Sequence, residues 1–411
     1  MRILIVNSYY YPEIEGGAEY SVKMLAETLV KNGHKVSVIC TAAEDKQENI
    51  EGVDVFRFKS KCIVRTKECY TKNSIIRKLH RLLDIYNPFN FGILDRLVKQ
   101  IKPEVIHSNG LYDISSVIWM VAKANKIHVV HTLRDYCLIC EHSNMLRRKT
   151  GEVCPEPSWL CKEYRRINAF LSRNVDAVTA PSQFTLDTVC NAGLFKKSEK
   201  SVIFNATDID LEQVHKNIER RKAEIENKTA FTFVFIGTLV EFKGIKWLIE
   251  CFESIDNPNL RLMICGKGEL QDYVEEESLK DSRIKYLGFL GQQELRMVLD
   301  GADALVCPSL WNEPFGRVVL DAYQAGLPVI ATNVGALPSV IENGKTGFII
   351  GASNGSELQQ KMLEMSKDKE KYSIMLKNVG AISDKFSLKI QCRRFTSLYL
   401  DCLKSYRGEG Q

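Results

Sequence analysis

Short apolar runs rich in β-branched residues alternate with segments of helical periodicity along the first half of the chain. Strands have this composition when crossover helices cover both faces of their sheet. The alternation therefore predicts βαβ units and a parallel sheet. The expected strands are residues 3–6, 36–40, 105–106, 129–131 and 177–180.

A second series of such runs begins at Phe231, after a charged stretch at residues 216–228. We interpret the charged stretch as the approach to a second domain, and the later runs as a second doubly wound parallel sheet. The tail, residues 386–406, repeats apolar side chains near the helical period and predicts a final helix. The runs of the second series are FTFVFIG, LRLMICG, IKYLGF, ALVCPS, PVIAT and TGFII.

The length of 411 residues agrees with more than one domain, since a domain averages about 150 residues. The expected fold is α/β, with a Rossmann-like amino-terminal domain over residues 1–206 and a second one over residues 207–385. The last helix, residues 386–411, is expected to pack back on the first domain. Ligands of such sheets bind beyond the carboxyl ends of the strands, so the loops that follow the strands are the places to seek function.

The net charge of +5 is divided unevenly along the chain. Residues 1–200 contain 30 basic and 22 acidic side chains, a balance of +8, and residues 57–102 alone contain 12 and 3, a balance of +9. The first domain is therefore expected to attract anions. No helix-turn-helix, zinc-finger or RNP pattern accompanies this charge, so nucleic acid is not an expected partner.

The amino terminus lacks the apolar core of a signal peptide, and no apolar run approaches the roughly 18 residues of a membrane span. We therefore expect a cytoplasmic protein. One segment, residues 75–86 (IIRKLHRLLDIY), places apolar residues on one helical face and basic residues on another. It is either a helix that lies on an anionic membrane surface, with Phe89 and Phe91 inserted, or an ordinary helix packed on the core.

Four cysteines, Cys137, Cys140, Cys154 and Cys161, fall within one loop-like stretch. They are either zinc ligands or free thiols, and free thiols are the default because the second pair is spaced more widely than in common structural zinc sites.

Three other patterns carry little chemistry. Asp208-Ile-Asp210 has the form of a metal-binding D-x-D motif, but we assign it to a linker, and neither a metal nor another cofactor is expected. Asn205-Ala-Thr207 fits the glycosylation pattern, which a cytosolic chain does not use. Gly266-Lys267-Gly268 lacks the third glycine of a dinucleotide fingerprint, so NAD chemistry is not expected.

Two loops have the composition of anion sites. Gly16-Gly17 precede an amphipathic helix, where small residues let backbone N–H groups approach an anion, although a plain turn explains the pair equally well. Lys243-Gly244 follow the run that ends at Gly237, and this lysine either neutralises a diphosphate or is simply solvated.

The most informative stretch is residues 304–335, ALVCPSLWNEPFGRVVLDAYQAGLPVIATNVG. A strand ends at Pro308-Ser309, a loop carries Glu313, and a helix that begins near Arg317 carries Asp321, about two turns beyond Glu313. Carboxylates placed in this way are suited to hold the hydroxyl groups of one extended sugar ligand.

Together these motifs resemble the retaining nucleotide-sugar glycosyltransferases of family 4, which share the GT-B fold of two facing Rossmann-like domains. The resemblance extends along most of the chain. It rests on Gly16-Gly17, Gly237, Lys243-Gly244, Gly266-Lys267-Gly268, Pro308-Ser309, Glu313, Asp321, residues 325–330 and residues 344–347.

The resemblance implies a role for each matching residue. Glu313 holds the donor sugar, Lys243 the diphosphate and Asp321 the nucleotide ribose. The segment HTLRDY, residues 131–136, resembles the one that bears the family's active-site histidine, and Arg134 stands at that position. The implied catalytic residues are Glu313, Lys243 and Arg134, and the implied donor-binding residues are Gly16, Gly17, Gly237, Thr238, Lys243, Glu313, Phe315, Gly316, Arg317 and Asp321.

Four residues depart from the family pattern. Asp321 and Ser339 stand where glutamate is usual or frequent, Thr238 where an arginine is frequent, and Arg134 where histidine is usual. Arginine stays protonated and cannot act as a base, although it can bind a phosphate or a polar sugar group. His131 is either its substitute or a structural histidine at a strand end. The family chemistry needs no enzymic base, because the departing diphosphate oxygen takes the acceptor proton.

We therefore expect a metal-independent retaining glycosyltransferase that uses a UDP- or GDP-sugar donor. The expected acceptor is a glycan or lipid-linked precursor, as in polysaccharide, lipopolysaccharide or capsule biosynthesis, at the cytoplasmic face of an anionic membrane. The alternative is a catalytically impaired protein of the same fold that binds a nucleotide sugar or a partner as a scaffold, as the departures indicate.

Overall fold

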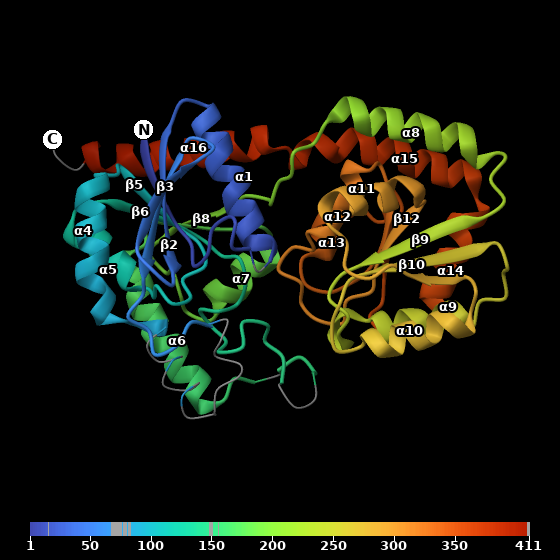
Figure 1. Ribbon diagram of the computed structural model, residues 1–411, viewed down its shortest axis with the longest axis horizontal. Coiled ribbons are helices and arrows are strands. Elements are labelled where there is room, and N and C mark those ends of the chain that lie inside the picture. Colours follow the sequence, from blue (N-terminus) through green and yellow to red (C-terminus); the bar gives the residue numbers. More distant parts are fainter. Residues whose placement is uncertain are drawn as a thin grey trace. The chain divides into compact units, whose positions relative to one another are not determined.

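The computed structural model of the protein describes residues 1–14, 16–66, 76, 80, 84–147, 151–154 and 156–408. The chain forms two compact units, each a sheet flanked by helices (Figure 1). The chain enters the second unit at Thr207 and returns to the first at Leu388. The first unit comprises Met1–Met145, Pro155–Ala206 and Leu388–Gln411, and the second comprises Leu146–Cys154 and Thr207–Ser387.

An eight-stranded sheet in the order β3-β4-β2-β1-β5-β6-β7-β8 forms the centre of the first unit. Neighbouring strands are parallel, except that β3 and β4 are antiparallel. The strand order reverses between β1 and β5, which pair with each other, so this is the point where loops diverge above the sheet. The strands are β1 (Arg2–Val6), β2 (Lys35–Ala42), β3 (Lys46–Ile50), β4 (Val53–Lys59), β5 (Val105–Ser108), β6 (His128–Thr132), β7 (Ala177–Ala180) and β8 (Glu199–Val202).

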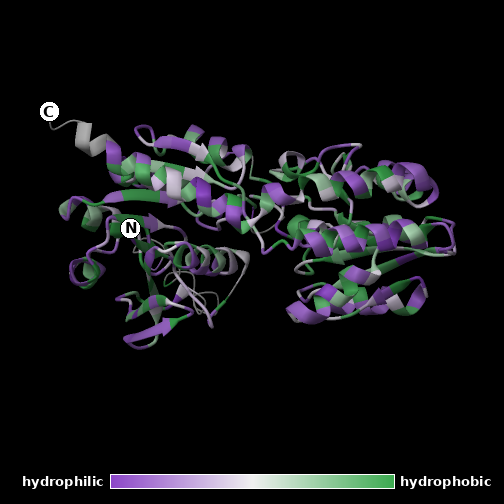
Figure 2. Cartoon of the chain, turned by 90° about the horizontal axis from the view of Figure 1, so that it is seen from above, coloured by the Kyte–Doolittle hydropathy of each residue, from purple (hydrophilic) through white to green (hydrophobic). Residues whose placement is uncertain are grey.

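Helices cover both faces of this sheet, and apolar residues gather on the strands while the helices alternate apolar and polar residues (Figure 2). The carboxyl-terminal helix α16 packs against α1 in the core of the first unit, through Phe395, Leu398 and Tyr399. The helices are α1 (Gly17–Lys31), η1 (Pro88–Asn90), α4 (Phe91–Ile101), α5 (Val117–Ala124), α6 (Trp159–Leu171), η2 (Ser172–Asn174), α7 (Gln183–Asn191) and α16 (Leu388–Gly408).

A buried chain of hydrogen bonds ties α16 to three strands of this sheet. The hydroxyl of Tyr399 lies 2.7 Å from His107 Nδ1, and His107 Nε2 lies 2.7 Å from the hydroxyl of Thr132. Thr132 in turn contacts the hydroxyl of Thr179 at 2.7 Å. Burial holds the pKa of His107 well below its usual value, so the imidazole is neutral and has one donor and one acceptor nitrogen for these two contacts.

We expect Tyr399→Phe to lower the free energy of unfolding by about 1–2 kcal/mol, because it leaves a buried nitrogen of His107 without its partner while the ring packing is kept. Urea unfolding followed by fluorescence measures the change. An unchanged midpoint would show that apolar packing alone holds α16 on the first unit.

The second unit is built on six parallel strands in the order β11-β10-β9-β12-β13-β14. The strand order reverses between β9 and β12, which are neighbours, and so the loops after these two strands leave the sheet side by side. The strands are β9 (Phe231–Ile236), β10 (Leu260–Cys265), β11 (Ile284–Tyr286), β12 (Ala304–Cys307), β13 (Val329–Thr332) and β14 (Gly347–Ile350).

The stretch at residues 216–228, interpreted as the approach to a second domain, lies within the second unit, which begins at Thr207, and mostly in a helix. Val214, Ile218 and Ile225 bury one face of that helix, α8 (Leu211–Ile225), while the charged residues lie mainly on the other. The buried Arg221 donates to the carbonyls of Ala302, Ala325 and Leu299, which explains one charge on the inner face.

The remaining helices of the second unit cover both faces of its sheet (Figure 1). They are α8 (Leu211–Ile225), η3 (Glu241–Lys243), α9 (Ile245–Glu253), α10 (Gln271–Lys280), α11 (Gln292–Gly301), α12 (Val318–Gln324), α13 (Leu337–Val340), α14 (Gly355–Lys367), α15 (Lys369–Ser383) and η4 (Asp384–Phe386).

The membrane-surface helix expected at residues 75–86 lies largely outside the described residues, which include only residues 76, 80 and 84–86 of it. Of the two aromatic residues expected to insert beside it, Phe89 is exposed and Phe91 is half-buried. Within the described part of the chain, no helix has the length and apolar character needed to cross a bilayer.

Candidate functional site

Glu313 lies in the loop after β12 and is held by three side-chain donors. Its Oε1 atom accepts hydrogen bonds from Lys243 Nζ at 2.5 Å, the Ser309 hydroxyl at 2.7 Å and the Trp311 indole N–H at 3.0 Å. Glu313 is buried, so this carboxylate has exchanged its hydration for these donors. We call Lys243, Ser309, Trp311 and Glu313 the Glu313 cluster.

Lys243 reaches the cluster from the neighbouring strand. It ends η3, which follows β9, and its ammonium group also lies 5.3 Å from the centre of the Trp311 ring. Because β9 and β12 flank the reversal of strand order, the cluster lies at the position where open α/β sheets bind their ligands. The sequence predicted both residues for this edge of the sheet, and the structure brings them into direct contact.

Two glycines allow the loops of the cluster to approach each other. Gly244 has φ +74°, and a Cβ there would lie 1.9 Å from the carbonyl oxygen of Pro308. Gly335 has φ +56°, and a Cβ there would lie 2.4 Å from the backbone nitrogen of Glu313. Both positions therefore require glycine, for its conformation and for the space.

The first loop of the unit joins β9 to η3 and contains Gly237 and Thr238. Gly237 N–H donates to the carbonyl of Cys265 at 3.0 Å, which fixes the loop against the end of β10. Thr238 is exposed and has an uncharged hydroxyl group. Residue 238 can therefore donate a hydrogen bond to a phosphate but cannot neutralise its charge.

The loop after Glu313 leads into α12. Phe315 is buried, with its ring 6.4 Å from that of Phe386, and Gly316 has φ +82°. Residues 313–317 form a loop, and Asp321 lies in the first turn of α12, which begins at Val318, close to the start expected near Arg317. Burial raises the pKa of Asp321, while the positive charges of Arg317 and Arg296 lower it.

Arg134 follows β6 in the first unit and is held between two asparagines. Its Nε atom donates to Asn109 Oδ1 at 3.0 Å, and a terminal nitrogen donates to Asn205 Oδ1 at 2.6 Å. A guanidinium stays protonated, so Arg134 carries a positive charge at the carboxyl end of β6. Asn205, assigned from the sequence only to a glycosylation pattern, therefore positions this arginine.

Gly16 and Gly17 lie at the start of α1 in the first unit. The N–H of Gly16 donates to Glu19 Oε2 at 2.9 Å, so a carboxylate of the first turn already occupies this donor. Gly16 has φ −169°, an extended conformation open to any residue.

His131, three residues before Arg134, is buried, and its contacts are those of a structural residue. Its Nδ1 lies 2.9 Å from the hydroxyl of Ser108, which also accepts from the indole of Trp119 at 3.0 Å, and its ring stacks on Phe195. Burial, with the charge of Arg134, lowers the pKa of His131 to about 3.

This depressed pKa predicts acid sensitivity. The unfolded chain, with a histidine pKa of 6.5, binds the proton before the folded chain does, so stability is complete above that pH and falls as the pH drops toward 3. Between pH 6.5 and pH 5, one such histidine is expected to lower the free energy of unfolding by about 2 kcal/mol.

Urea unfolding of wild type and His131→Gln at these two pH values tests the prediction, with the exposed His215→Gln as control. The His131→Gln variant is expected to lose less stability than wild type on acidification, and His215→Gln as much as wild type. An identical loss in all three proteins would contradict the assignment.

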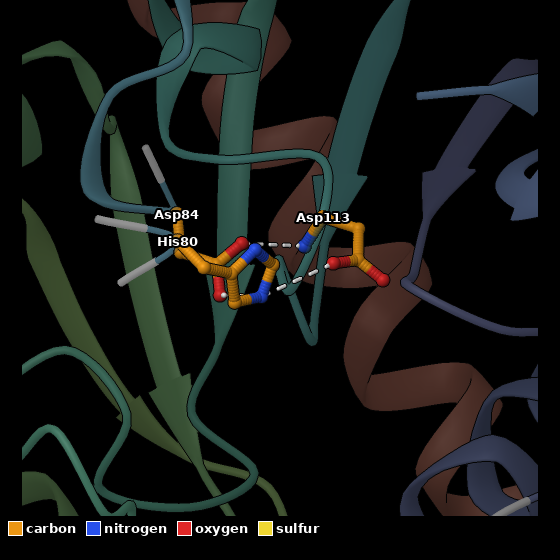
Figure 3. A group of neighbouring side chains, drawn as sticks. All are labelled: His80, Asp84 and Asp113. Carbon is orange, nitrogen blue, oxygen red and sulfur yellow. Dashed lines mark hydrogen bonds and ion pairs between the residues drawn. The ribbon is translucent and has the colours of Figure 1, made fainter. Parts of the chain in front are cut away.

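Within the described residues, one group of side chains lies close enough to share a metal ion, namely His80, Asp84 and Asp113. Figure 3 shows the imidazole beside both carboxylates. The hydroxyl of Thr66 donates to Asp113 Oδ1 at 2.8 Å and lies 3.0 Å from His80 Nε2, and the N–H of Asp113 donates to Asp84 Oδ1 at 2.8 Å. These hydrogen bonds form a network that joins Thr66 and His80 to the loop of Asp113.

The cysteines expected as zinc ligands or free thiols do not form such a group. Of the four, Cys137, Cys140 and Cys161 lie in the first unit, and no metal-binding group within the described residues includes them. Burial and the nearby Asp135 raise the pKa of the Cys137 thiol well above its usual value. Asp210 of the D-x-D pattern caps α8 by accepting from Gln213 N–H at 3.1 Å.

Comparison with known proteins gives matches along nearly the whole chain. Residues 15–211 match the family described as Glycosyltransferase Family 4, and residues 216–380 match Glycosyl transferases group 1. An uncharacterized 42.6 kDa protein in the cps region of Klebsiella pneumoniae is 30% identical over 341 residues, which cover 82% of this chain and 86% of that protein.

Two further proteins are similar to this chain over most of their length. An uncharacterized glycosyltransferase of Methanocaldococcus jannaschii is 29% identical over 366 residues, 86% of each chain. The crystal structure of Anabaena HepE in complex with UDP superposes with a TM-score of 0.71 at 19% identity, covering 98% of this chain and 100% of that one.

Proposed function

The chain belongs to the family 4 type of glycosyltransferase with the GT-B fold, and from this we propose that it moves a sugar with retention of anomeric configuration. The donor is a UDP- or GDP-sugar bound by the second unit, and the reaction needs no metal ion. The acceptor is a glycan or lipid-linked precursor bound by the first unit.

The Glu313 cluster is the observation that carries this proposal. It places an ammonium group and a carboxylate together at the point where strand order reverses in the second sheet. An ammonium group suits a diphosphate and a carboxylate suits sugar hydroxyl groups, so the two residues match two adjacent groups of a nucleotide-diphosphate sugar, the diphosphate and the sugar. Solved structures that share this fold were obtained with UDP and with UDP-glucose, which supports a nucleotide-sugar donor.

Donor binding changes the partners of Lys243 in this proposal. Without donor, Glu313 neutralises the ammonium group at 2.5 Å. An incoming diphosphate carries more negative charge than one carboxylate and attracts Lys243 more strongly, while Ser309 and Trp311 continue to hold Glu313. Glu313 then has an oxygen available for a sugar hydroxyl.

Electrostatic stabilisation of the leaving group is the main catalytic task. The acceptor hydroxyl attacks from the face that the diphosphate leaves, and the leaving oxygen takes the hydroxyl proton. Lys243 stabilises the negative charge that develops on that oxygen. In the second unit, the backbone at Phe315 and Gly316 contacts the sugar and phosphate, Asp321 binds the ribose, and Gly237, Thr238 and Arg317 complete its part of the donor site. From the family resemblance we also assign Gly16, Gly17 and Arg134 of the first unit to the reaction.

The proposed acceptor is a lipid-linked or polysaccharide precursor at the cytoplasmic membrane face. The positive balance of residues 1–200 supports an anionic surface or ligand for the first unit. The similar Klebsiella protein is described as lying in a cps region, which supports a polysaccharide product such as a capsule.

A second candidate function is nucleotide-sugar binding without turnover. Three residues favour it, because Arg134, Thr238 and Ser339 replace groups that are usual or frequent in the family. The hydroxyl of Ser339 donates to the carbonyl of Ala336 at 2.7 Å, so it completes a turn of backbone rather than offering a charge.

A panel of UDP- and GDP-sugars, labelled in the sugar and mixed with membrane extract, separates the two functions. The transferase predicts release of nucleoside diphosphate and incorporation of label into lipid-extractable or polymeric material. The binding protein predicts saturable donor binding with neither. The double variant Lys243→Ala/Glu313→Gln is expected to lose both activities. If it released nucleoside diphosphate and incorporated label at the wild-type rate, the assigned site would be contradicted.

A further inference from the structure

Helix α6 in the first unit presents a row of large apolar side chains to solvent. Trp159 is 70% exposed, Phe170 63%, Leu160 55% and Ile167 42%. These four residues, the apolar row of α6, recur at helical spacing and so lie along one side of the helix. Soluble proteins rarely leave so many large apolar side chains together in water, and such patches commonly mark binding surfaces.

The opposite side of α6 fixes the orientation of the apolar row. The hydroxyl of Tyr164 donates to the carbonyl of Cys137, Arg165 Nε donates to the carbonyl of Ile139 at 2.8 Å, and Asn168 Nδ2 donates to the carbonyl of Leu138 at 3.0 Å. Rotation of the helix to bury the apolar row would break all three contacts. The inner side of α6 therefore holds these three polar side chains together with Leu171, and the apolar row faces solvent.

Basic side chains lie beside the apolar row. Lys162, Arg166 and Arg173 are exposed, and the guanidinium of Arg173 lies 5.5 Å from the centre of the Phe170 ring. Residues 159–173 contain four basic residues and one acidic residue, a balance of +3. The acidic residue, Glu163, pairs with Arg166 at 2.6 Å.

We propose that α6 is a membrane-docking helix that lies flat on an anionic bilayer. Its apolar row enters the boundary between headgroups and acyl chains, where tryptophan is favoured, and Lys162, Arg166 and Arg173 contact lipid phosphates. The charge distinguishes this occupant from a second copy of the chain, because a symmetric dimer through α6 would bring the two positive faces together. The first unit is thereby held at a lipid surface.

This docking surface deepens the proposed function, since it rests on a membrane-associated acceptor, but its binding to lipid requires no donor. Vesicle binding is measured without nucleotide sugar. Failure of docking and failure of sugar transfer are therefore distinguishable.

The experiment is co-sedimentation of the full chain with vesicles of phosphatidylcholine, alone or mixed with phosphatidylglycerol. Wild type is expected to bind the mixed vesicles, and less strongly at high salt. We expect each double variant to weaken vesicle binding about tenfold or more. Trp159→Ala/Phe170→Ala removes apolar surface that inserts into the bilayer. Lys162→Glu/Arg173→Glu removes the attraction to anionic lipid.

The matched control is Leu279→Ala/Met297→Ala, which removes side chains that are 87% and 71% exposed in the second unit and is expected to bind like wild type. Urea midpoints verify that all variants fold. Equal binding of wild type and Trp159→Ala/Phe170→Ala, or no binding by wild type, would overturn the proposal. So would light scattering that found wild type dimeric and the apolar variant monomeric.

Discussion

Replacing Lys243 by alanine is expected to lower kcat/KM for sugar transfer by about 10²–10³-fold, the usual effect of losing one group that stabilises a developing oxyanion. The ammonium group is the one cation of the Glu313 cluster, so its loss leaves the leaving diphosphate without neutralisation there. The substitution also leaves the buried carboxylate of Glu313 with only Ser309 and Trp311 as donors, so a loss of stability is expected as well, and the urea midpoint is measured beside the rate. Steady-state release of nucleoside diphosphate measures the rate.

Lys246→Ala is the matched control for this substitution. Lys246 is exposed in the first turn of α9, three residues beyond Lys243, and its ammonium group lies 5.8 Å from the ring of Tyr273, away from the cluster. We expect Lys246→Ala to keep the wild-type rate, and Lys243→Arg to recover part of it because the charge is restored. Equal rates for the Lys243→Ala and Lys246→Ala proteins would remove Lys243 from the reaction.

Gly244→Ala is expected to destabilise the second unit by about 3 kcal/mol and to lower the transfer rate as well. The added Cβ would lie 1.9 Å from the carbonyl oxygen of Pro308, so the backbone beside Ser309 must move. Ser309 positions Glu313, and a small displacement of a catalytic group costs a large factor in rate.

Gly344→Ala separates the two causes of the expected destabilisation, which are the left-handed backbone conformation and the contact of the added Cβ with Pro308. Gly344 has φ +75°, nearly the same as the φ of +74° at Gly244, but a Cβ there would meet nothing within 4 Å. We expect it to cost only the roughly 1 kcal/mol of the left-handed conformation, with activity retained. Urea unfolding of both variants measures the difference, and equal midpoints would show that the contact with Pro308 is not what requires glycine at residue 244.

The apolar runs of the sequence predicted most of the strands that lie inside the sheets, because burial on both faces favours an unbroken apolar composition. They did not predict the interior strand β4 (VDVFRFK), in which polar residues interrupt the apolar run. They also missed β3 (KQENI) and β8 (EKSV), whose largely exposed or half-buried residues lie at the two edges of the first sheet. The charged α8 was not predicted as a helix for a related reason, because its few buried residues are separated by charged ones.

The candidate site shows the same limit at the level of side chains. The sequence pattern placed Lys243 and Glu313 in loops that follow strands, but nothing in it indicated that Trp311 and Ser309 would hold the carboxylate. The partners of Arg134, Asn109 and Asn205, come from loops far apart in the sequence. The outward direction of the apolar row of α6 likewise depends on the carbonyls that Tyr164, Arg165 and Asn168 bind.

Calorimetric titration of UDP, GDP and the corresponding monophosphates tests most directly the claim that Lys243 holds the diphosphate of the donor. One of the two diphosphates is expected to bind wild type at least about tenfold more tightly than its monophosphate, because the second phosphate adds charge beside the ammonium group. In Lys243→Ala this preference should disappear while monophosphate binding is kept. The same preference in Lys243→Ala as in wild type would contradict the account.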